Sequence, residues 1–95
     1  MEETAKLIKL IVDKDMEGLY TLEKQTTETM VTLNNTLKNL RITLSTLEEC
    51  ELQECEEFEL IDNRCADYSE KLQDSTKFLF KVRKAIASLE ESNNC

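Results

Sequence analysis

Four cysteines are the most reactive side chains of this 95-residue chain. Cys50, Cys55, Cys65 and Cys95 form no Cys-x-x-Cys pair, and the chain has no histidine, so the ligand pattern of a zinc site is missing. Within one helix, Cys50 and Cys55 would lie too far apart for a disulfide. Because disulfides are rare in the cytosol, we expect reduced thiols, with Cys65 packed as a small core residue.

Carboxylates are concentrated in residues 48–62, a segment with eight acidic residues and no basic one. Paired carboxylates can perform acid–base catalysis, but histidine, the usual proton-transfer residue at neutral pH, is missing from the chain. The sequence has no glycine-rich phosphate loop, no nucleophile elbow and no calcium loop with its turn glycine. It therefore predicts no enzyme, metal site or cofactor, and it predicts a solvated acidic face over this segment.

The elements that carry these residues are expected to be helices, because one glycine and no proline leave few residues for tight turns. The content of 40% hydrophobic and 34% charged residues is typical of helices that share a core with other helices. A net charge of −8 argues against nucleic acid as a partner. No apolar stretch is long enough to cross a membrane and no secretion signal is recognisable, so we expect a cytoplasmic protein.

Hydrophobic residues recur at alternating steps of three and four from Met30 to Leu89. Fifteen of the eighteen positions in this register are apolar when Cys and Tyr are counted, whereas the overall composition would place about seven there. Such a repeat predicts a left-handed coiled coil. We call these apolar residues the seam, and we expect them to bind partner helices: Met30, Leu33, Leu37, Leu40, Leu44, Leu47, Phe58, Ile61, Cys65, Tyr68, Leu72, Leu79, Val82, Ile86 and Leu89.

Two successive positions of the repeat hold Glu51 and Glu54. Charged seam positions disfavour the association of identical chains in parallel, so we interpret this pair as residues that select the partner. Ordinary solubilising charge is the alternative interpretation. A basic segment of a neighbouring helix would relieve the repulsion, and the chain itself contains one, at Lys71, Lys77, Lys81, Arg83 and Lys84.

The sequence predicts an all-α fold with one long coiled-coil helix over about residues 20–91 and a short helix before it. The failure of the repeat near residues 50–56 leaves an alternative, in which the helix bends or folds back there as an α-hairpin. Gly18 favours a hinge near residues 15–18, because an interior glycine weakens a helix by about 1 kcal/mol relative to alanine. The predicted organisation is a short amphipathic helix over 1–15, a coiled-coil domain over 16–91 and a frayed terminus over 92–95.

Two blocks of the sequence resemble the pallidin-like coiled-coil subunits of the complex for biogenesis of lysosome-related organelles. The first block contains Leu19-x2-Leu22 and Met30-x-Thr32-Leu33-x3-Leu37-x2-Leu40, and the second is Tyr68-x2-Lys71-Leu72-x4-Lys77. The resemblance covers most of residues 16–89, with the acidic segment lengthening the distance between the blocks. Another small helical subunit of the same complex, or of its lysosome-positioning relative, is an alternative match.

The resemblance implies a non-enzymatic subunit of an elongated cytosolic hetero-oligomer that is peripheral on endosomal membranes. Such a subunit would act in endosomal trafficking and vesicle transport to lysosome-related organelles, without a cofactor. Its implied partners are other coiled-coil subunits and syntaxin-type fusion proteins. Two other classes share the heptad pattern. SNARE-type fusion coiled coils have Gln or Arg in a central layer where this chain has Glu51 and Glu54; structural coiled coils of kinetochores or chromosome axes form the other class.

Overall fold

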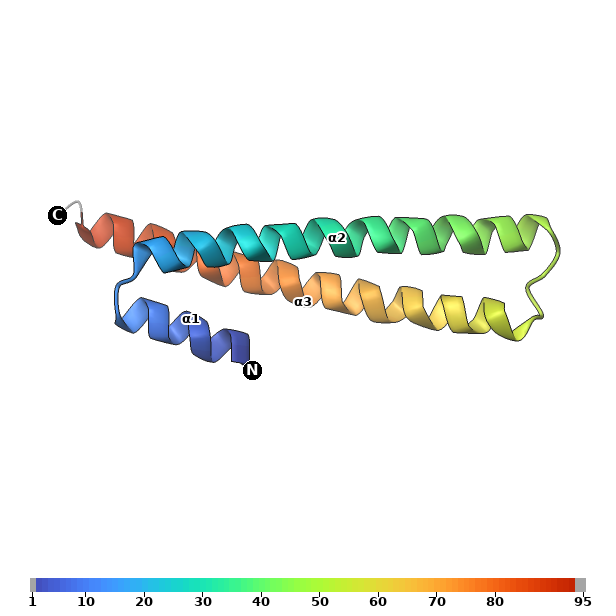
Figure 1. Cartoon of the computed structure of the whole chain (residues 1–95), viewed down its shortest axis with the longest axis horizontal. Helices are drawn as coiled ribbons and strands as arrows, with labels where there is room; N and C mark the ends of the chain where they lie inside the picture. The colour runs from blue at the N-terminus through green and yellow to red at the C-terminus, as the bar shows by residue number, and fades with distance from the viewer. Residues whose placement is uncertain (1, 94–95) are drawn as a thin grey trace. The chain divides into compact units, whose positions relative to one another are not determined.

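A computed structural model describes residues 2–93 and folds them into three helices, α1 (Glu2–Val12), α2 (Met16–Glu49) and α3 (Glu56–Asn93) (Figure 1). No strand occurs among these residues, so the predicted all-α class is confirmed. The chain divides into two compact units. The three-helix unit, Met1–Thr29 with Ser75–Cys95, contains α1 and one part each of α2 and α3; the hairpin unit, Met30–Asp74, contains the turn between α2 and α3.

The single long helix predicted over residues 20–91 is wrong, because α2 ends at Glu49 and α3 begins at Glu56. The alternative, a fold-back near residues 50–56, is confirmed. Within the hairpin unit, the second part of α2 and the first part of α3 pack together as a helical hairpin (Figure 1). The two halves of the predicted repeat therefore meet within one chain.

The reversal depends on Glu51, whose φ of 60° lies in the left-handed region that glycine usually occupies at the end of a helix. The Glu51 N–H donates to the Glu48 carbonyl (3.0 Å), and the Leu52 N–H donates to the Leu47 carbonyl (2.8 Å). This pair of hydrogen bonds is the Schellman arrangement, which satisfies carbonyls that have no partner within the helix. Because this segment contains neither glycine nor proline, the residue types that usually mark a turn do not reveal it in the sequence.

A second turn of the same kind joins α1 to α2. Lys14 has a φ of 53°, and its N–H donates to the Ile11 carbonyl (3.1 Å). The N–H of the next residue, Asp15, donates to the Leu10 carbonyl (3.0 Å). Both helix ends therefore use a charged residue in the left-handed conformation, and the hydrogen bonds around it define the turn.

Gly18 lies in the first turn of α2, so the hinge predicted over residues 15–18 is displaced toward residues 13–15. Its N–H donates to the Asp15 carboxylate (3.0 Å), which caps the helix. A Cβ atom on Gly18 would stand 2.6 Å from Cδ2 of Leu10 and 2.7 Å from Oδ2 of Asp15. A side chain at this position would therefore displace both the Leu10 side chain and the capping carboxylate of Asp15.

Threonine hydroxyls bond repeatedly to the backbone of α2. The hydroxyl donates to the carbonyl four residues earlier at Thr21, Thr26, Thr27, Thr29, Thr43 and Thr46. Such bonds and β-branching lower the intrinsic preference for helix, so packing must supply much of the stability of α2.

The C-terminal part of α3 continues to Asn93. Residues 94–95, which belong to the frayed terminus predicted over 92–95 and include Cys95, lie outside the described residues. The predicted division into 1–15, 16–91 and 92–95 stays a prediction.

We expect Glu51→Gly to raise the free energy of unfolding by about 1 kcal/mol. Glycine removes the left-handed strain of about 1–2 kcal/mol, and the greater conformational entropy of glycine in the unfolded chain offsets only part of this gain. Urea denaturation followed by circular dichroism measures the change. Glu51→Gln is the control for loss of charge alone, and Glu48→Gly, within α2, should lower the same free energy by about 1 kcal/mol. A decrease for Glu51→Gly would contradict the assigned turn.

We expect Gly18→Ala to lower the melting temperature, although helix propensity alone would favour alanine by about 1 kcal/mol. The added Cβ must displace both the Leu10 side chain, which packs against the core cluster, and the capping carboxylate of Asp15. Calorimetry measures the shift, with the exposed Ser45→Ala substitution in α2 as the propensity control. A rise for Gly18→Ala equal to that of the control would show that α1 does not approach this closely.

Candidate coiled-coil interface

In the three-helix unit, α1 helps to close a core around the seam. Leu19 and Val82 are 0% exposed, and Leu7 of α1 is 4% exposed. They belong to one hydrophobic cluster with Leu22 and Ile86. The leucines that α2 contributes to this cluster lie outside the predicted seam. The sequence signal that could have identified them is the apolar stripe before Met30. The seam residues of this unit are Leu79, Val82, Ile86 and Leu89. The first three are buried, and Leu89 is half-buried.

In the hairpin unit, the same register is much less enclosed. Leu37, at 3% exposed, is the one buried seam residue of this unit. Its other seam residues are half-buried: Met30, Leu33, Leu40, Leu44, Leu47, Phe58, Ile61, Cys65, Tyr68 and Leu72. The predicted register therefore coincides with the least exposed side of both helix segments, and each segment covers part of the other. Binding of partner helices by these residues stays a prediction.

The residues that border the seam also differ between the units. In the three-helix unit, Phe78 and Ala85 stand immediately before seam residues and pack against the core cluster. In the hairpin unit the corresponding positions are polar, at Thr36, Thr43, Glu57, Arg64 and Lys71. A broad apolar face suits a helix within a globular bundle, whereas a narrow seam with polar borders is typical of a coiled coil.

Glu51 and Glu54 are exposed and lie in the turn between α2 and α3. The expectation that they stand within a helical seam is therefore wrong, because the helix ends before both of them. Their role in partner selection stays a prediction. The acidic segment occupies the end of α2, the turn and the start of α3, with its carboxylates at Glu48, Glu49, Glu51, Glu54, Glu56, Glu57, Glu59 and Asp62.

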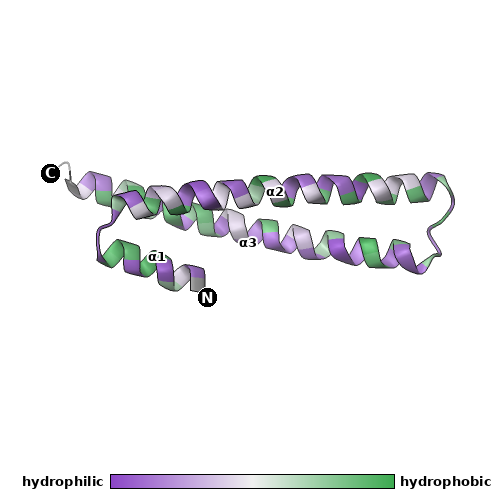
Figure 2. Ribbon diagram, viewed as in Figure 1, coloured by the Kyte–Doolittle hydropathy of each residue, from purple (hydrophilic) through white to green (hydrophobic). Residues whose placement is uncertain are grey.

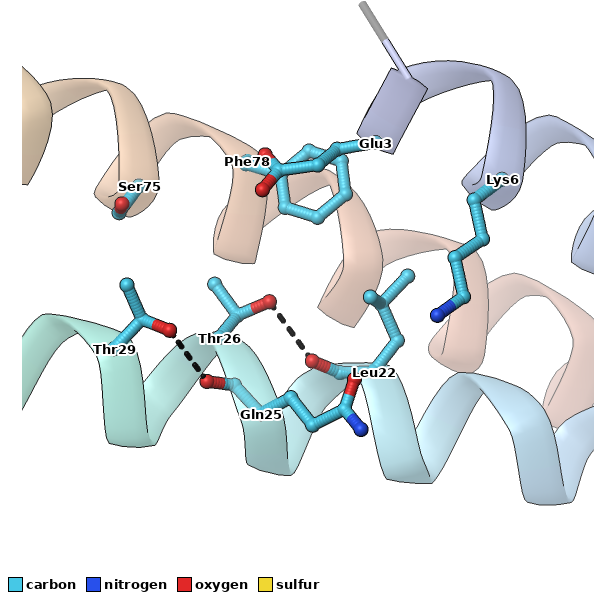
Figure 3. Close-up of a pocket in the computed structure, with 8 residues that line it drawn as sticks. All are labelled: Glu3, Lys6, Leu22, Gln25, Thr26, Thr29, Ser75 and Phe78. Atoms are coloured by element: carbon cyan, nitrogen blue, oxygen red, sulfur yellow. Dashed lines mark hydrogen bonds between the residues drawn. The ribbon is translucent and has the colours of Figure 1, made fainter.

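A pocket of about 190 Å³ opens in the three-helix unit beside short polar side chains (Figure 3). Thr26, 8% exposed, donates its hydroxyl hydrogen bond to the Leu22 carbonyl (2.8 Å), and Ser75 lies across the pocket from it. Phe78 completes the apolar part of the lining. Threonine and serine fill less volume than leucine at these places, so the pocket is a gap in the packing of the helices.

Polar contacts also join α2 to α3 within the three-helix unit. The Tyr20 hydroxyl donates to the Glu90 carboxylate, and Nε of Arg83 lies 3.5 Å from Oε2 of Glu23. The hydrogen bond to Glu90 raises the pKa of Tyr20, and desolvation and the charges of Glu90 and Glu23 act in the same direction. Exposed ion pairs contribute only about 0–1 kcal/mol each, so the Arg83–Glu23 pair adds little beside the hydrophobic cluster.

The thiols of the described residues are free. Cys50 and Cys55 are the first and last residues of the turn and do not lie in one helix, contrary to the expectation. The Cys55 thiol donates to the Leu52 carbonyl (2.9 Å). Cys65 is half-buried in the seam. Among the described residues, no three His, Cys, Asp or Glu side chains converge as ligands for a metal ion.

Comparison of the whole chain with family models, curated proteins and solved structures found no match. None of the helices formed by residues 2–93 combines the length and apolar character needed to cross a membrane.

The Tyr20–Glu90 hydrogen bond predicts a dependence of stability on alkaline pH. Because the pKa of folded Tyr20 lies above its ordinary value of about 10, the bond stabilises the protein fully below that pH. Its contribution is lost as pH rises through the folded-state pKa. We therefore expect the melting temperature of the wild-type chain to fall more steeply above pH 10 than that of Tyr20→Phe. A Tyr20→Phe curve parallel to the wild type would contradict the contact.

Proposed function

We propose that this protein is a non-enzymatic coiled-coil subunit of a cytosolic hetero-oligomeric complex that acts in endosomal trafficking and in the biogenesis of lysosome-related organelles. The resemblance of its two sequence blocks to pallidin-like subunits supports the biological role. In this proposal its partners are other coiled-coil subunits and syntaxin-type proteins, it needs no cofactor, and its contact with endosomal membranes is peripheral. Its biochemical activity is the packing of helices.

The observation that carries the proposal is the difference in burial along one register. Where α1 adds a third helix, Leu19 and Val82 are 0% exposed. In the hairpin unit, which has two helix segments, all seam residues except Leu37 remain half-buried. A further helix along this unit would remove apolar surface from water, which stabilises an association by about 25 cal/mol per Å² of apolar surface before the entropic cost of binding.

The composition of α2 supports the proposal that partner helices complete the packing around it. Residues 30–47 contain two charged residues, Lys38 and Arg41, and many threonines and asparagines. Depletion of charge is the compositional feature of interface cores, and the low helix preference of threonine leaves the segment dependent on packing. In this proposal the partner helix lies on the side of the seam that Thr36 and Thr43 border, where side chains are small and uncharged.

Affinity purification of the full chain from native cells, followed by mass spectrometry, tests the proposal. We expect endosomal sorting subunits to be recovered, and recovery of spindle or chromosome-axis proteins in their place would contradict the role. Leu40→Ala with Leu44→Ala should abolish recovery, because each truncation removes about 2 kcal/mol, and two such losses weaken binding by at least about a hundredfold.

A second variant separates loss of the interface from loss of the hairpin. Thr36→Arg with Thr43→Arg leaves every seam leucine in place and adds bulk and charge at the border of the seam. We expect its helicity by circular dichroism to match the wild type while recovery of partners falls. Val31→Gln with Ile42→Gln, at two positions that are each 55% exposed and outside the seam, is the matched control and should retain recovery. Undiminished recovery with the arginine variant would refute the assigned side of the seam.

A further inference from the structure

The turn that joins α1 to α2 holds one residue in an unfavourable conformation. It consists of Asp13, Lys14 and Asp15, and Lys14 has a φ of 53°, where residues with a Cβ atom are disfavoured. None of the three is glycine or proline, so each can also adopt a helical conformation. A short hinge under strain favours opening. A continuous helix through α1 and α2 would therefore relieve the strain at Lys14.

The apolar pattern of the sequence runs through this turn without a break. Apolar residues follow one another at steps of three, four, four and three, at Ala5, Ile8, Val12, Met16 and Leu19. On a continuous helix this spacing forms one stripe. In the bent chain the stripe is divided, because Leu19 is 0% exposed whereas Ile8 is 55% and Val12 73% exposed. Hydrophobic periodicity therefore does not require the chain to reverse between α1 and α2.

The contacts between α1 and α2 are arranged symmetrically about Lys14. A Cβ atom on Gly18 would stand 2.6 Å from Cδ2 of Leu10, and these two residues lie four positions after and four before Lys14. Glu3 and Gln25, eleven positions before and after it, line one pocket (Figure 3). Separations of four and eleven residues are close to one and three whole turns of a helix. On a continuous helix all four residues therefore lie on the side of Lys14, and an antiparallel second copy can meet this side with the same pairs.

The contact of α1 with its own chain is limited. The helix has 11 residues, and Leu7, at 4% exposed, is the one buried side chain within residues 3–12. Figure 2 shows the hydrophobic colouring of α1, part of which belongs to exposed residues. The pocket of about 190 Å³ between Glu3 and Lys6 of α1 and Phe78 of α3 leaves part of the contact unfilled. Because so short a helix depends on packing, α1 needs an equivalent groove wherever it moves.

The groove beneath α1 selects its occupant. Leu19 and Val82, which are 0% exposed, form one cluster with Leu7 and would lose its cover if α1 left. Exposure of such a core to water is unfavourable, so the groove must be filled again. Helix α1 is the segment that the structure shows to fit this groove, and a second copy of the chain supplies an identical helix. Exchange between two copies reproduces the contacts of α1, including those of its charged residues.

We propose that the α1-binding groove of the three-helix unit is an interface for a second copy of this chain, in which two copies exchange their α1 helices. In the exchanged dimer, α1 and α2 form one continuous helix that passes its counterpart antiparallel near Lys14, and each α1 packs on the core cluster of the other copy. The turn sets the balance between monomer and dimer. This interface lies outside the seam of the hairpin unit on which the proposed function rests, so either proposal can fail alone.

Sedimentation equilibrium of the full-length chain under reducing conditions tests the exchange through its turn. The wild-type chain should show a reversible equilibrium between monomer and dimer. Lys14→Gly should raise the dissociation constant of the dimer at least about tenfold, because glycine relieves the bent conformation and weakens the continuous helix in both copies. Asp15→Ala should lower it at least about tenfold, because it removes the carboxylate that caps Gly18 and introduces the best helix former.

Two control variants show whether the turn between α1 and α2 is responsible. Glu51→Gly introduces glycine at the left-handed residue of the other turn, and Ser45→Ala introduces alanine at an exposed position within α2. Both should leave the dissociation constant unchanged. Monomers alone, for the wild type and for Asp15→Ala up to about 1 mM, would overturn the proposal. Equal dissociation constants for Lys14→Gly and Asp15→Ala would overturn it as well.

A distance within one chain separates exchange from side-by-side association. Spin labels are placed at Glu3 and Thr29 of the Asp15→Ala chain with its native cysteines replaced by serine. Dilution with an excess of the same chain without labels makes double electron–electron resonance report distances within one copy. Both residues line one pocket, so the bent chain keeps the labels within roughly 25 Å of each other. A continuous helix separates them by roughly 39 Å, at 1.5 Å per residue. The long distance is expected in the dimer, and a dimer that shows the short distance alone would refute the exchange.

Discussion

The reversal of the chain at Glu51 is the constraint on which the remaining structure of the hairpin unit depends. A left-handed residue with hydrogen bonds back to the Leu47 and Glu48 carbonyls ends α2 and turns the backbone so that α3 can return. Because of this turn, leucines that precede it pack against residues that follow it. A stripe that would otherwise need another chain along its whole length thus obtains a partner from its own sequence, at the cost of one strained residue.

The same heptad register then has two different surroundings. In the three-helix unit, α1 and the apolar borders Phe78 and Ala85 enclose it, and the core includes two side chains at 0% exposed. In the hairpin unit, polar residues border it and most of its side chains remain half-buried. Two helices cannot bury a seam as completely as three, so the hairpin unit retains apolar surface for association. This difference underlies the proposed role as a subunit.

The sequence predicted helix type and register well, because the 3.5-residue pattern depends on many residues at once and tolerates single exceptions such as Ser75. It did not decide between a continuous helix and a hairpin. That decision rests on the backbone dihedrals at Glu51, as the turn between α1 and α2 rests on those at Lys14, and neither residue type signals a left-handed conformation. The gap beside Thr26 and the close contacts around Gly18 were equally hidden, because both arise from the approach of side chains on different elements.

Measurement of a distance across the hairpin unit tests this account most directly. Spin labels at Asn35 and Glu70, in a chain whose native cysteines are replaced by serine, report the separation by double electron–electron resonance. Helices packed at roughly 8–10 Å between axes place the labels within roughly 30 Å of each other. A continuous helix would separate the same residues by roughly 52 Å, from 1.5 Å per residue. A distribution centred on the short distance is expected, and one centred on the long distance would contradict the reversal at Glu51.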